Sequence, residues 1–354
     1  MTRKATNALI GATLAVLTAN AAAGYYFYRT AFIRRKKPLV PEGFDDPTQD
    51  GASAVTGDSL ASDCPTDPDC PPQPVADMAA DNADMPIKPL SPHEIDRLWL
   101  SSQEALRTYA LHSTDNLLLK AKYLPARIPT NRTAILVHGY SADALSMAGF
   151  ARHYHEVLGY NVLLPDNRAH GESEGRHIGF GWVDRLDLSL WIRKAIELAG
   201  PDAGIVLHGV SMGGATVLMA SGDPQPPEVK AIVSDCAYSS VWEELRWRLK
   251  EDYRLPAFPV LHSATLIARV LTGRDYRKGS ALAQVARSRT PTLFVHGDAD
   301  TFVPYEMVHR LHKACASEKA LCVIPEAGHA EAWDVDRETY VRHLHAFLNR
   351  HMAG

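Results

Sequence analysis

The chain has 354 residues, 46% of them hydrophobic, and a formal net charge of −4. That length accommodates one large domain with additional segments, and the apolar share is ordinary for a globular protein. Charge is uneven: residues 1–40 hold seven basic residues and no acidic one, whereas residues 41–90 hold eleven acidic residues and one lysine. The rest is nearly neutral and shows no basic stripe, which argues against nucleic-acid binding.

Residues 8–28 contain no charged side chain. A helix of about 20 such residues is long enough to span a bilayer. The aromatic cluster at 25–28 suits the membrane interface, and the basic residues between Arg29 and Lys37 suit lipid headgroups. We therefore predict that residues 1–37 form a membrane anchor with a basic flank, which holds the protein at the membrane through one N-terminal helix.

Two features of this segment leave alternatives open. Ala19-Asn20-Ala21 offers the small residues of a cleaved signal peptide, but the apolar character continues past it, which favours an uncleaved anchor. Basic residues after the segment favour a cytoplasmic body. The start Met-x-Arg-Lys before an apolar run instead resembles a signal-anchor, which places the body outside. An extracytoplasmic body is the preferred expectation, and the side of the membrane stays open.

Residues 38–92 hold eleven of the 23 prolines together with many Asp, Ala and Ser. Such a composition cannot bury enough apolar surface to fold, so a disordered tether is predicted. Cys64 and Cys70 lie within it and could form a disulfide in an exported protein or stay as free thiols. Neither the cysteines nor the histidine pairs at 153–155 and 343–345 match a metal-binding motif, so no metal or other cofactor is expected.

From residue 93 onward, short apolar runs alternate with helical periodicity, as in a mainly parallel sheet covered by helices on both faces. Residues 238–288 interrupt this alternation and are rich in Trp, Arg, Leu and Pro. We predict an α/β domain at 93–354 with an eight-stranded sheet and a small helical cap at about 238–288. The expected strands lie at 107–111, 117–123, 133–138, 161–165, 205–210, 231–233, 292–296 and 321–325.

The pentapeptide Gly209-Val210-Ser211-Met212-Gly213 follows the apolar run 204–208 and precedes an expected helix at 212–221. Gly-x-Ser-x-Gly between a strand and a helix is typical of a nucleophile elbow. The turn is so tight that its neighbours must be small, and the residues after Met212 are indeed Gly, Gly and Ala. Ser211 is therefore the candidate nucleophile, although so short a motif needs partners to support it.

A nucleophilic serine needs a base, and the base needs an acid that orients it. Asp300, in the loop after the strand at 292–296, is the preferred acid. Asp298 in the same loop is more easily explained as a turn residue, and Asp235 after the preceding strand is a weaker rival. His329, on the loop after the last strand, is the candidate base. His329 could instead be a loop residue that caps the last helix. The presence of Ser211 and Asp300 at the expected places favours the role of base over this alternative.

An oxyanion hole needs two backbone N–H donors. We expect one from Met212, directly after the nucleophile, and the other from Tyr140 in the loop after the strand at 133–138. Gly139 permits the close approach, and His138 is expected to shape the loop. The segment 166–175 holds Arg and His residues that could look catalytic, but we expect Asp166 and Arg168 to fix that loop.

These motifs together resemble those of the α/β-hydrolase superfamily across residues 105–350, and most nearly its membrane-anchored, serine-aminopeptidase-like or prolyl-oligopeptidase-like bacterial hydrolases. The family loop usually has Gly where this chain has Ala169. The resemblance implies an α/β-hydrolase fold and a hydrolase. It rests on the N-terminal apolar segment and on residues 138–140, 166–175, 178–182, 209–214, 296–304 and 328–329.

The leading hypothesis is a serine hydrolase that cleaves a carboxylic ester of a small molecule through an acyl-enzyme. A serine aminopeptidase or acylpeptide hydrolase with the same triad is the alternative. In that case Glu243, Glu244 or Glu251 of the cap could bind the chain terminus of the substrate. A non-catalytic protein of the same fold usually lacks a triad member, and Ser211 argues against dehalogenases and epoxide hydrolases, which use Asp. The cap is expected to set the acyl and alcohol preference.

Overall fold

The computed structural model describes residues 3–34 and 89–352, with side chains from Thr18 onward in the first helix. The predicted tether at 38–92 lies almost entirely outside the described residues, and so do Cys64 and Cys70. The boundaries predicted between anchor, tether and hydrolase domain therefore stay predictions. The three described cysteines, Cys236, Cys315 and Cys322, are buried free thiols.

The described chain contains one eight-stranded sheet in the order β1-β2-β4-β3-β5-β6-β7-β8. The pairs β1–β2 and β2–β4 are antiparallel, and every other pair is parallel. This confirms the predicted α/β fold, because continuous apolar runs such as 134–137 are fully buried. The strands are β1 (Arg107–His112), β2 (Leu118–Leu124), β3 (Arg132–Val137), β4 (Asn161–Pro165), β5 (Gly204–Val210), β6 (Val229–Asp235), β7 (Thr292–Gly297) and β8 (Lys319–Ile324).

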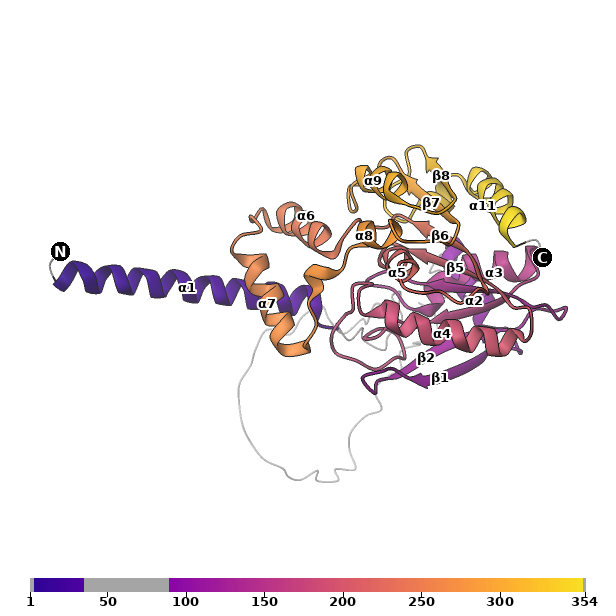
Figure 1. The fold of residues 1–354 in the computed structure, drawn as a ribbon, viewed down its shortest axis with the longest axis horizontal. Helices are drawn as coiled ribbons and strands as arrows, with labels where there is room; N and C mark the ends of the chain where they lie inside the picture. The colour runs from indigo at the N-terminus through magenta and orange to yellow at the C-terminus, as the bar shows by residue number, and fades with distance from the viewer. Residues whose placement is uncertain (1–2, 35–88, 353–354) are drawn as a thin grey trace, which may run out of the picture. The chain divides into compact units, whose positions relative to one another are not determined.

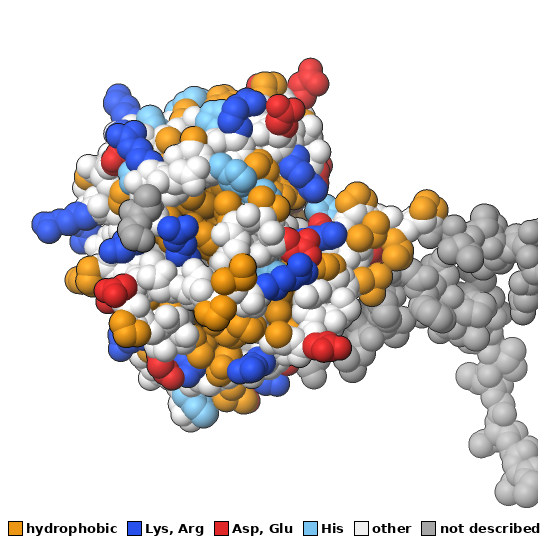
Figure 2. Space-filling view, turned by 90° about the vertical axis from the view of Figure 1, so that its right-hand side faces the viewer, with side chains coloured by type: hydrophobic (Ala, Val, Ile, Leu, Met, Phe, Trp, Pro, Cys, Tyr) orange, Lys and Arg blue, Asp and Glu red, His pale blue; other side chains and the backbone are white. Residues whose placement is uncertain are grey.

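Helices cover both faces of the sheet, each over its own hydrophobic core (Figure 1). One face is covered by α4 (Asp184–Ala199), α5 (Met212–Ser221), α8 (Ala281–Val285) and α9 (Glu306–Ala314). The other is covered by α2 (Pro92–Ser101), α3 (Ala148–Arg152), α10 (Ala332–Val335) and α11 (Arg337–His351). The surface seen in Figure 2 carries Lys and Arg side chains scattered among acidic and hydrophobic ones.

The segment predicted as a helical cap, 238–288, contains two longer helices before α8. They are α6 (Val241–Tyr253) and α7 (Val260–Thr272), and a short 3-10 turn at Tyr276–Lys278 follows them. Ser240 caps α6 by accepting a hydrogen bond from the Glu243 N–H. The buried hydrophobic side chains of α6 and α7 belong to the same hydrophobic core as those of α4 and α5.

The N-terminal helix α1 (Arg3–Phe32) corrects one prediction. Among the described residues, no helix has both the length and the apolar character that a membrane span requires. The predicted membrane anchor and membrane localisation are therefore wrong. The uncharged stretch 8–28 holds only five large aliphatic residues and consists mostly of Ala with Gly, Thr, Asn and aromatic residues. Phe27 and Tyr28, predicted to lie at a membrane interface, are instead buried against the domain.

Candidate active site

Ser211 lies in the turn between β5 and α5 with φ 56° and ψ −116°. A non-glycine residue holds such a backbone conformation only where its surroundings impose it. A Cβ atom at Gly209 would collide with the carbonyl oxygen of Gly213, and one at Gly213 would collide with that of Val137. The small residues of the pentapeptide are therefore required by sterics, and the turn places Ser211 at the carboxyl edge of the parallel strands.

The structure brings Ser211, His329 and Asp300 together in one hydrogen-bonded row. The Oγ atom of Ser211 is 2.8 Å from Nε2 of His329, and Nδ1 of His329 is 2.8 Å from Oδ2 of Asp300. Because a carboxylate can only accept, Nδ1 carries the hydrogen and Nε2 is left to accept from the serine hydroxyl. This is the arrangement in which a histidine can take the proton of a serine.

Asp300 is held as an ionised acceptor. Its Oδ1 accepts the N–H groups of Phe302 and Val303, each at 2.9 Å. Burial alone would raise the pKa of Asp300, but hydrogen bonds from His296 and His329 and the backbone donors hold that pKa well below its usual range. Asp298 accepts the N–H of Glu326 and thereby ties the acid loop to the loop that carries His329.

Asp235, the weaker candidate for the acid, lies at the end of β6 and is buried. Its backbone carbonyl accepts the N–H of Ser211 at 2.9 Å. Burial raises the pKa of its carboxyl to about 6, which favours the neutral form. The bond from His329 goes to Asp300, so the geometry favours Asp300 as the partner of the base.

Two residues to which the sequence alone assigned no role contact Asp300 and His329. The fully buried His296 places Nε2 3.2 Å from Oδ2 of Asp300. The ring of Phe302 stacks on the imidazole of His329, with centroids 4.7 Å apart and planes 28° apart. His296 and Phe302 both lie within four residues of Asp300 in the sequence. This closeness is the feature by which the sequence could have pointed to them.

The loop after β3 lies against Ser211. A Cβ atom at Gly139 would be 3.5 Å from Cβ of Ser211, so glycine permits this close approach. Tyr140 follows Gly139 and lines the same cleft as Ser211. Met212 is the first residue of α5, where backbone N–H groups have no partner within the helix. Of the two residues predicted as oxyanion donors, Met212 thus directly follows Ser211, and Tyr140 lines the same cleft as Ser211.

His138 is a loop-shaping residue. It is fully buried, with Nδ1 2.8 Å from the carbonyl of Gly139 and Nε2 3.0 Å from the N–H of Asn167. These partners select a neutral imidazole that donates from Nδ1 and accepts at Nε2. Burial lowers the pKa of His138 to about 3, in line with a neutral ring.

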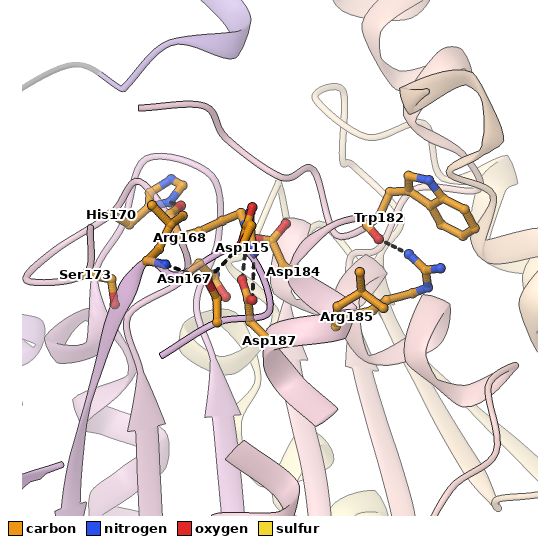
Figure 3. A network of polar contacts seen from close by, with 12 residues as sticks. Asp115, Asn167, Arg168, His170, Ser173, Trp182, Asp184, Arg185 and Asp187 are labelled. Carbon is orange, nitrogen blue, oxygen red and sulfur yellow. Dashed lines mark hydrogen bonds and ion pairs between the residues drawn. The ribbon is translucent and has the colours of Figure 1, made fainter. Parts of the chain in front are cut away.

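The loop 166–175 is held by a buried ionic network (Figure 3). The guanidinium of Arg168 donates to both oxygens of Asp187, at 2.6 and 2.7 Å, and to both of Asp115, at 2.9 and 3.1 Å. Asp166 accepts the N–H groups of Ala144 and Glu172. Ala169, where glycine was expected, has φ 61°. These contacts give the loop a structural role beside the site.

A cleft of about 500 Å³ opens beside Ser211. Its walls come from α2, from the loop after β3 through α3, from Phe302 and from the loop of His329. This differs from the expectation that the cap shapes the substrate cleft, because no lining residue in the described chain belongs to 238–288. The side chains that make its wall mostly apolar are Tyr140, Leu145, Met147, Phe150, Val210, Phe302 and Trp333.

Two basic side chains that line this cleft lie close to carboxylates. His93 lies 3.0 Å from Asp334, and Arg97 lies 3.4 Å from Asp143. A larger cleft of about 620 Å³ lies at the amino ends of β6 and β7 and contains none of the predicted site residues.

The three cap glutamates lie outside the cleft beside Ser211. Glu243 accepts from Arg310 at 3.0 Å and from Ser239. Glu251 lies 3.7 Å from Lys250 and 3.8 Å from Arg254. Glu244 is buried, and among the described residues neither of its carboxyl oxygens has a hydrogen-bond partner. Burial raises the pKa of Glu244 to about 8.

We expect Glu244→Met to raise the free energy of unfolding relative to the wild-type protein, and to raise it more at pH 9 than at pH 5. In that range the unfolded chain releases a proton from Glu244 that the folded protein keeps, so wild-type stability falls with rising pH. Methionine has a similar size and no ionisable group, so it removes this loss. It should raise the free energy of unfolding by about 1–3 kcal/mol at pH 9. Urea unfolding at both pH values measures it, with Glu251→Met on the same helix as control. An equal effect at pH 5 and pH 9 contradicts the prediction.

One group of three potential metal-binding side chains occurs among the described residues: Cys236, Asp300 and His329, with ligand atoms within 4.8 Å of one another. Burial raises the pKa of the Cys236 thiol well above its usual value, so it stays protonated. Asp300 and His329 are already bonded to each other. Cysteine binds a metal ion as the thiolate, and Cys236 is protonated. The three residues therefore fit the hydrogen-bonded row with Ser211 better than a metal site.

The family model described as Alpha/beta hydrolase family matches residues 134–342, more than half of the chain. This chain belongs to the alpha/beta hydrolase family. The protein YqkD of Bacillus subtilis is 30% identical to this alpha/beta hydrolase over 220 residues, which cover 62% of this chain and 72% of YqkD. The range matched by the family model includes Ser211, Asp300 and His329, and membership supports a hydrolase.

Solved structures agree on the fold. The Pyrococcus furiosus esterase Pf2001 matches this alpha/beta hydrolase with a TM-score of 0.54 and 22% identity, over 72% of this chain and 95% of the esterase. A Pyrococcus horikoshii acylaminoacyl peptidase matches with a TM-score of 0.53 and 18% identity, over 72% of this chain and 43% of the peptidase. At such identities the two matches establish a shared architecture.

Proposed function

We propose that this alpha/beta hydrolase cleaves carboxylic esters of small molecules by serine catalysis. Ser211 is the nucleophile, His329 the general base and Asp300 the acid that orients the base. One observation carries the proposal: an unbroken row of two 2.8 Å hydrogen bonds runs from a strained serine to an ionised carboxylate. Family membership supplies hydrolysis as the class of reaction.

The reaction follows from these positions. Oγ of Ser211 attacks the ester carbonyl while its proton passes to Nε2 of His329. The N–H groups of Tyr140 and Met212 stabilise the oxyanion of the tetrahedral intermediate. Its collapse breaks the ester bond, and His329 gives the proton to the leaving alcohol. Water then attacks the acyl-enzyme, passing a proton to His329, and a second collapse releases the acid and restores the serine hydroxyl.

Asp300 contributes through its charge and its fixed position. Its low pKa keeps it ionised over the working pH range, so it stabilises the imidazolium that forms when His329 takes the proton. The stacked ring of Phe302 limits the orientations open to His329. The base therefore faces Ser211 before the substrate arrives.

Amide cleavage by the same residues is the second candidate, because the acylaminoacyl peptidase shares this architecture. An aminopeptidase that recognises a free chain terminus needs a charged group to bind it. Here His93 and Arg97 at the cleft are each paired with an acid, and Glu243 is paired with Arg310 away from it. The mostly apolar cleft therefore favours a neutral ester.

The test compares the two substrate classes on the purified full chain. Initial rates with p-nitrophenyl acetate and butyrate are set against those with alanyl and acetyl-alanyl aminomethylcoumarin. We expect kcat/KM for the esters to exceed that for the amides, and a fluorophosphonate probe to label Ser211. A higher kcat/KM for the amides favours the peptidase, and a chain that the probe does not label points to a non-catalytic member.

A further inference from the structure

The C-terminal end of α1 is built into the domain next to the candidate site. Phe32 is fully buried, with its ring centroid 4.9 Å from that of Phe180 and 5.1 Å from that of Tyr276. Phe27 and Tyr28 are buried in the same hydrophobic core. In Figure 1 this end of α1 lies beside α7. The helix end is therefore packed on two sides by the domain.

The backbone after Phe32 continues this attachment. The carbonyl of Phe32 accepts the N–H of Ile178 at 3.0 Å, and the N–H of Arg34 donates to the carbonyl of Arg176 at 2.8 Å. The guanidinium of Arg34 donates to the carbonyl of Ser173 at 2.8 Å and to that of Gly171. The N-terminal segment thus holds the loop that runs from Asp166 to Gly181.

Tyr140 is held by the same two segments. Its hydroxyl donates to the carbonyl of Ala31, in the last turn of α1, at 2.7 Å. Its ring lies 5.6 Å from that of Phe180, which packs on Phe32. Its own carbonyl contacts Nε2 of His170 in the loop that Arg34 holds. One residue away, Gly139 lies against Ser211.

We propose that the end of α1, through the carbonyl of Ala31 and the ring of Phe32, positions the Tyr140 loop for oxyanion stabilisation. The inference rests on the proposed function, in which the Tyr140 N–H meets the oxyanion. Such donors act only when they are fixed in advance, and a shift of about 1 Å can cost about 100-fold in rate. Tyr140 through its hydroxyl, and Phe32, are thus positioning residues.

The experiment uses Tyr140→Phe in the full chain, which removes only the hydroxyl. We expect kcat for p-nitrophenyl butyrate to fall about 10-fold, less than the loss of a whole donor, with little change in KM. Binding of an alkyl trifluoromethyl ketone, whose adduct with Ser211 carries an oxyanion, should weaken in parallel. A merely structural defect has no reason to weaken this adduct and spare KM. Phe32→Ala should act in the same direction.

Tyr26→Phe is the matched control, because it removes a hydroxyl from an exposed tyrosine of the same helix. It should leave kcat and ketone binding unchanged. Wild-type kcat and wild-type ketone affinity in Tyr140→Phe overturn the inference. If Phe32→Ala does not fold, Tyr140→Phe alone decides. A wild-type chain that neither hydrolyses the ester nor reacts with a fluorophosphonate overturns the proposed function, and this inference with it.

Discussion

Ser211→Ala is expected to lower kcat for a short-chain aryl ester by about 10⁶-fold. Alanine lacks the oxygen that attacks the carbonyl, and His329 then has no nucleophile to activate. The substitution keeps a Cβ atom and therefore keeps the sterics of the turn between β5 and α5. We expect circular dichroism and the urea midpoint to match the wild-type protein, with KM nearly unchanged because the cleft wall is intact.

Ser141→Ala is the matched control for this variant. Ser141 lines the same cleft but lies outside the bonded row of Ser211, His329 and Asp300. It should retain most of the wild-type kcat. Activity of Ser211→Ala within tenfold of wild type would remove Ser211 from the mechanism and leave the observed hydrolysis to another group or to a contaminant.

Asp300→Asn is expected to lower kcat by about 10⁴-fold. Both oxygens of Asp300 accept, one from backbone N–H groups and the other from His329 and His296. The side chain of asparagine accepts only at its oxygen, because its NH₂ group donates. If its oxygen keeps the backbone donors, its NH₂ group faces His329, and the imidazole then carries its hydrogen on Nε2, toward Ser211. That tautomer cannot take the serine proton.

Asp298→Asn and Asp235→Asn are the controls for the identity of the acid. An asparagine oxygen at 298 can still accept the N–H of Glu326, so this variant should keep most of its activity. The Nδ1 atom of His329 is bonded to Asp300 and not to Asp235, so the amide at 235 should cost far less activity than the amide at 300. A larger loss in Asp235→Asn than in Asp300→Asn contradicts the assignment of Asp300. Rates of all three at pH 7 and pH 8 give the comparison.

The sheet could be predicted because parallel strands buried on both faces are continuous apolar runs. The expected strand at 133–138 corresponds to β3, and that at 205–210 corresponds to β5. Between β3 and β4 the helical segment divides into a 3-10 turn, α3 and a π-helical turn. The periodicity of a short segment does not reveal such local changes in winding.

The first helix shows where a local pattern is insufficient. An uncharged stretch beside aromatic and basic residues has the same appearance whether its partner is lipid or protein. The aromatic side chains at 27, 28 and 32 are buried against residues more than 100 positions later in the chain. Only the packing of those distant segments shows what covers them.

The order of the motifs by itself determined the fold class and the residues to consider: a serine after β5, an acid after β7 and a histidine after β8. This was possible because the carboxyl ends of neighbouring parallel strands meet at one edge of the sheet, so chain order translates into proximity. Tertiary structure alone decided the position of the cleft between the α2–α3 side and His329, the burial of Glu244 and the attachment of Tyr140 to α1. Each of these depends on side chains from segments far apart in sequence, whose contacts no local pattern encodes.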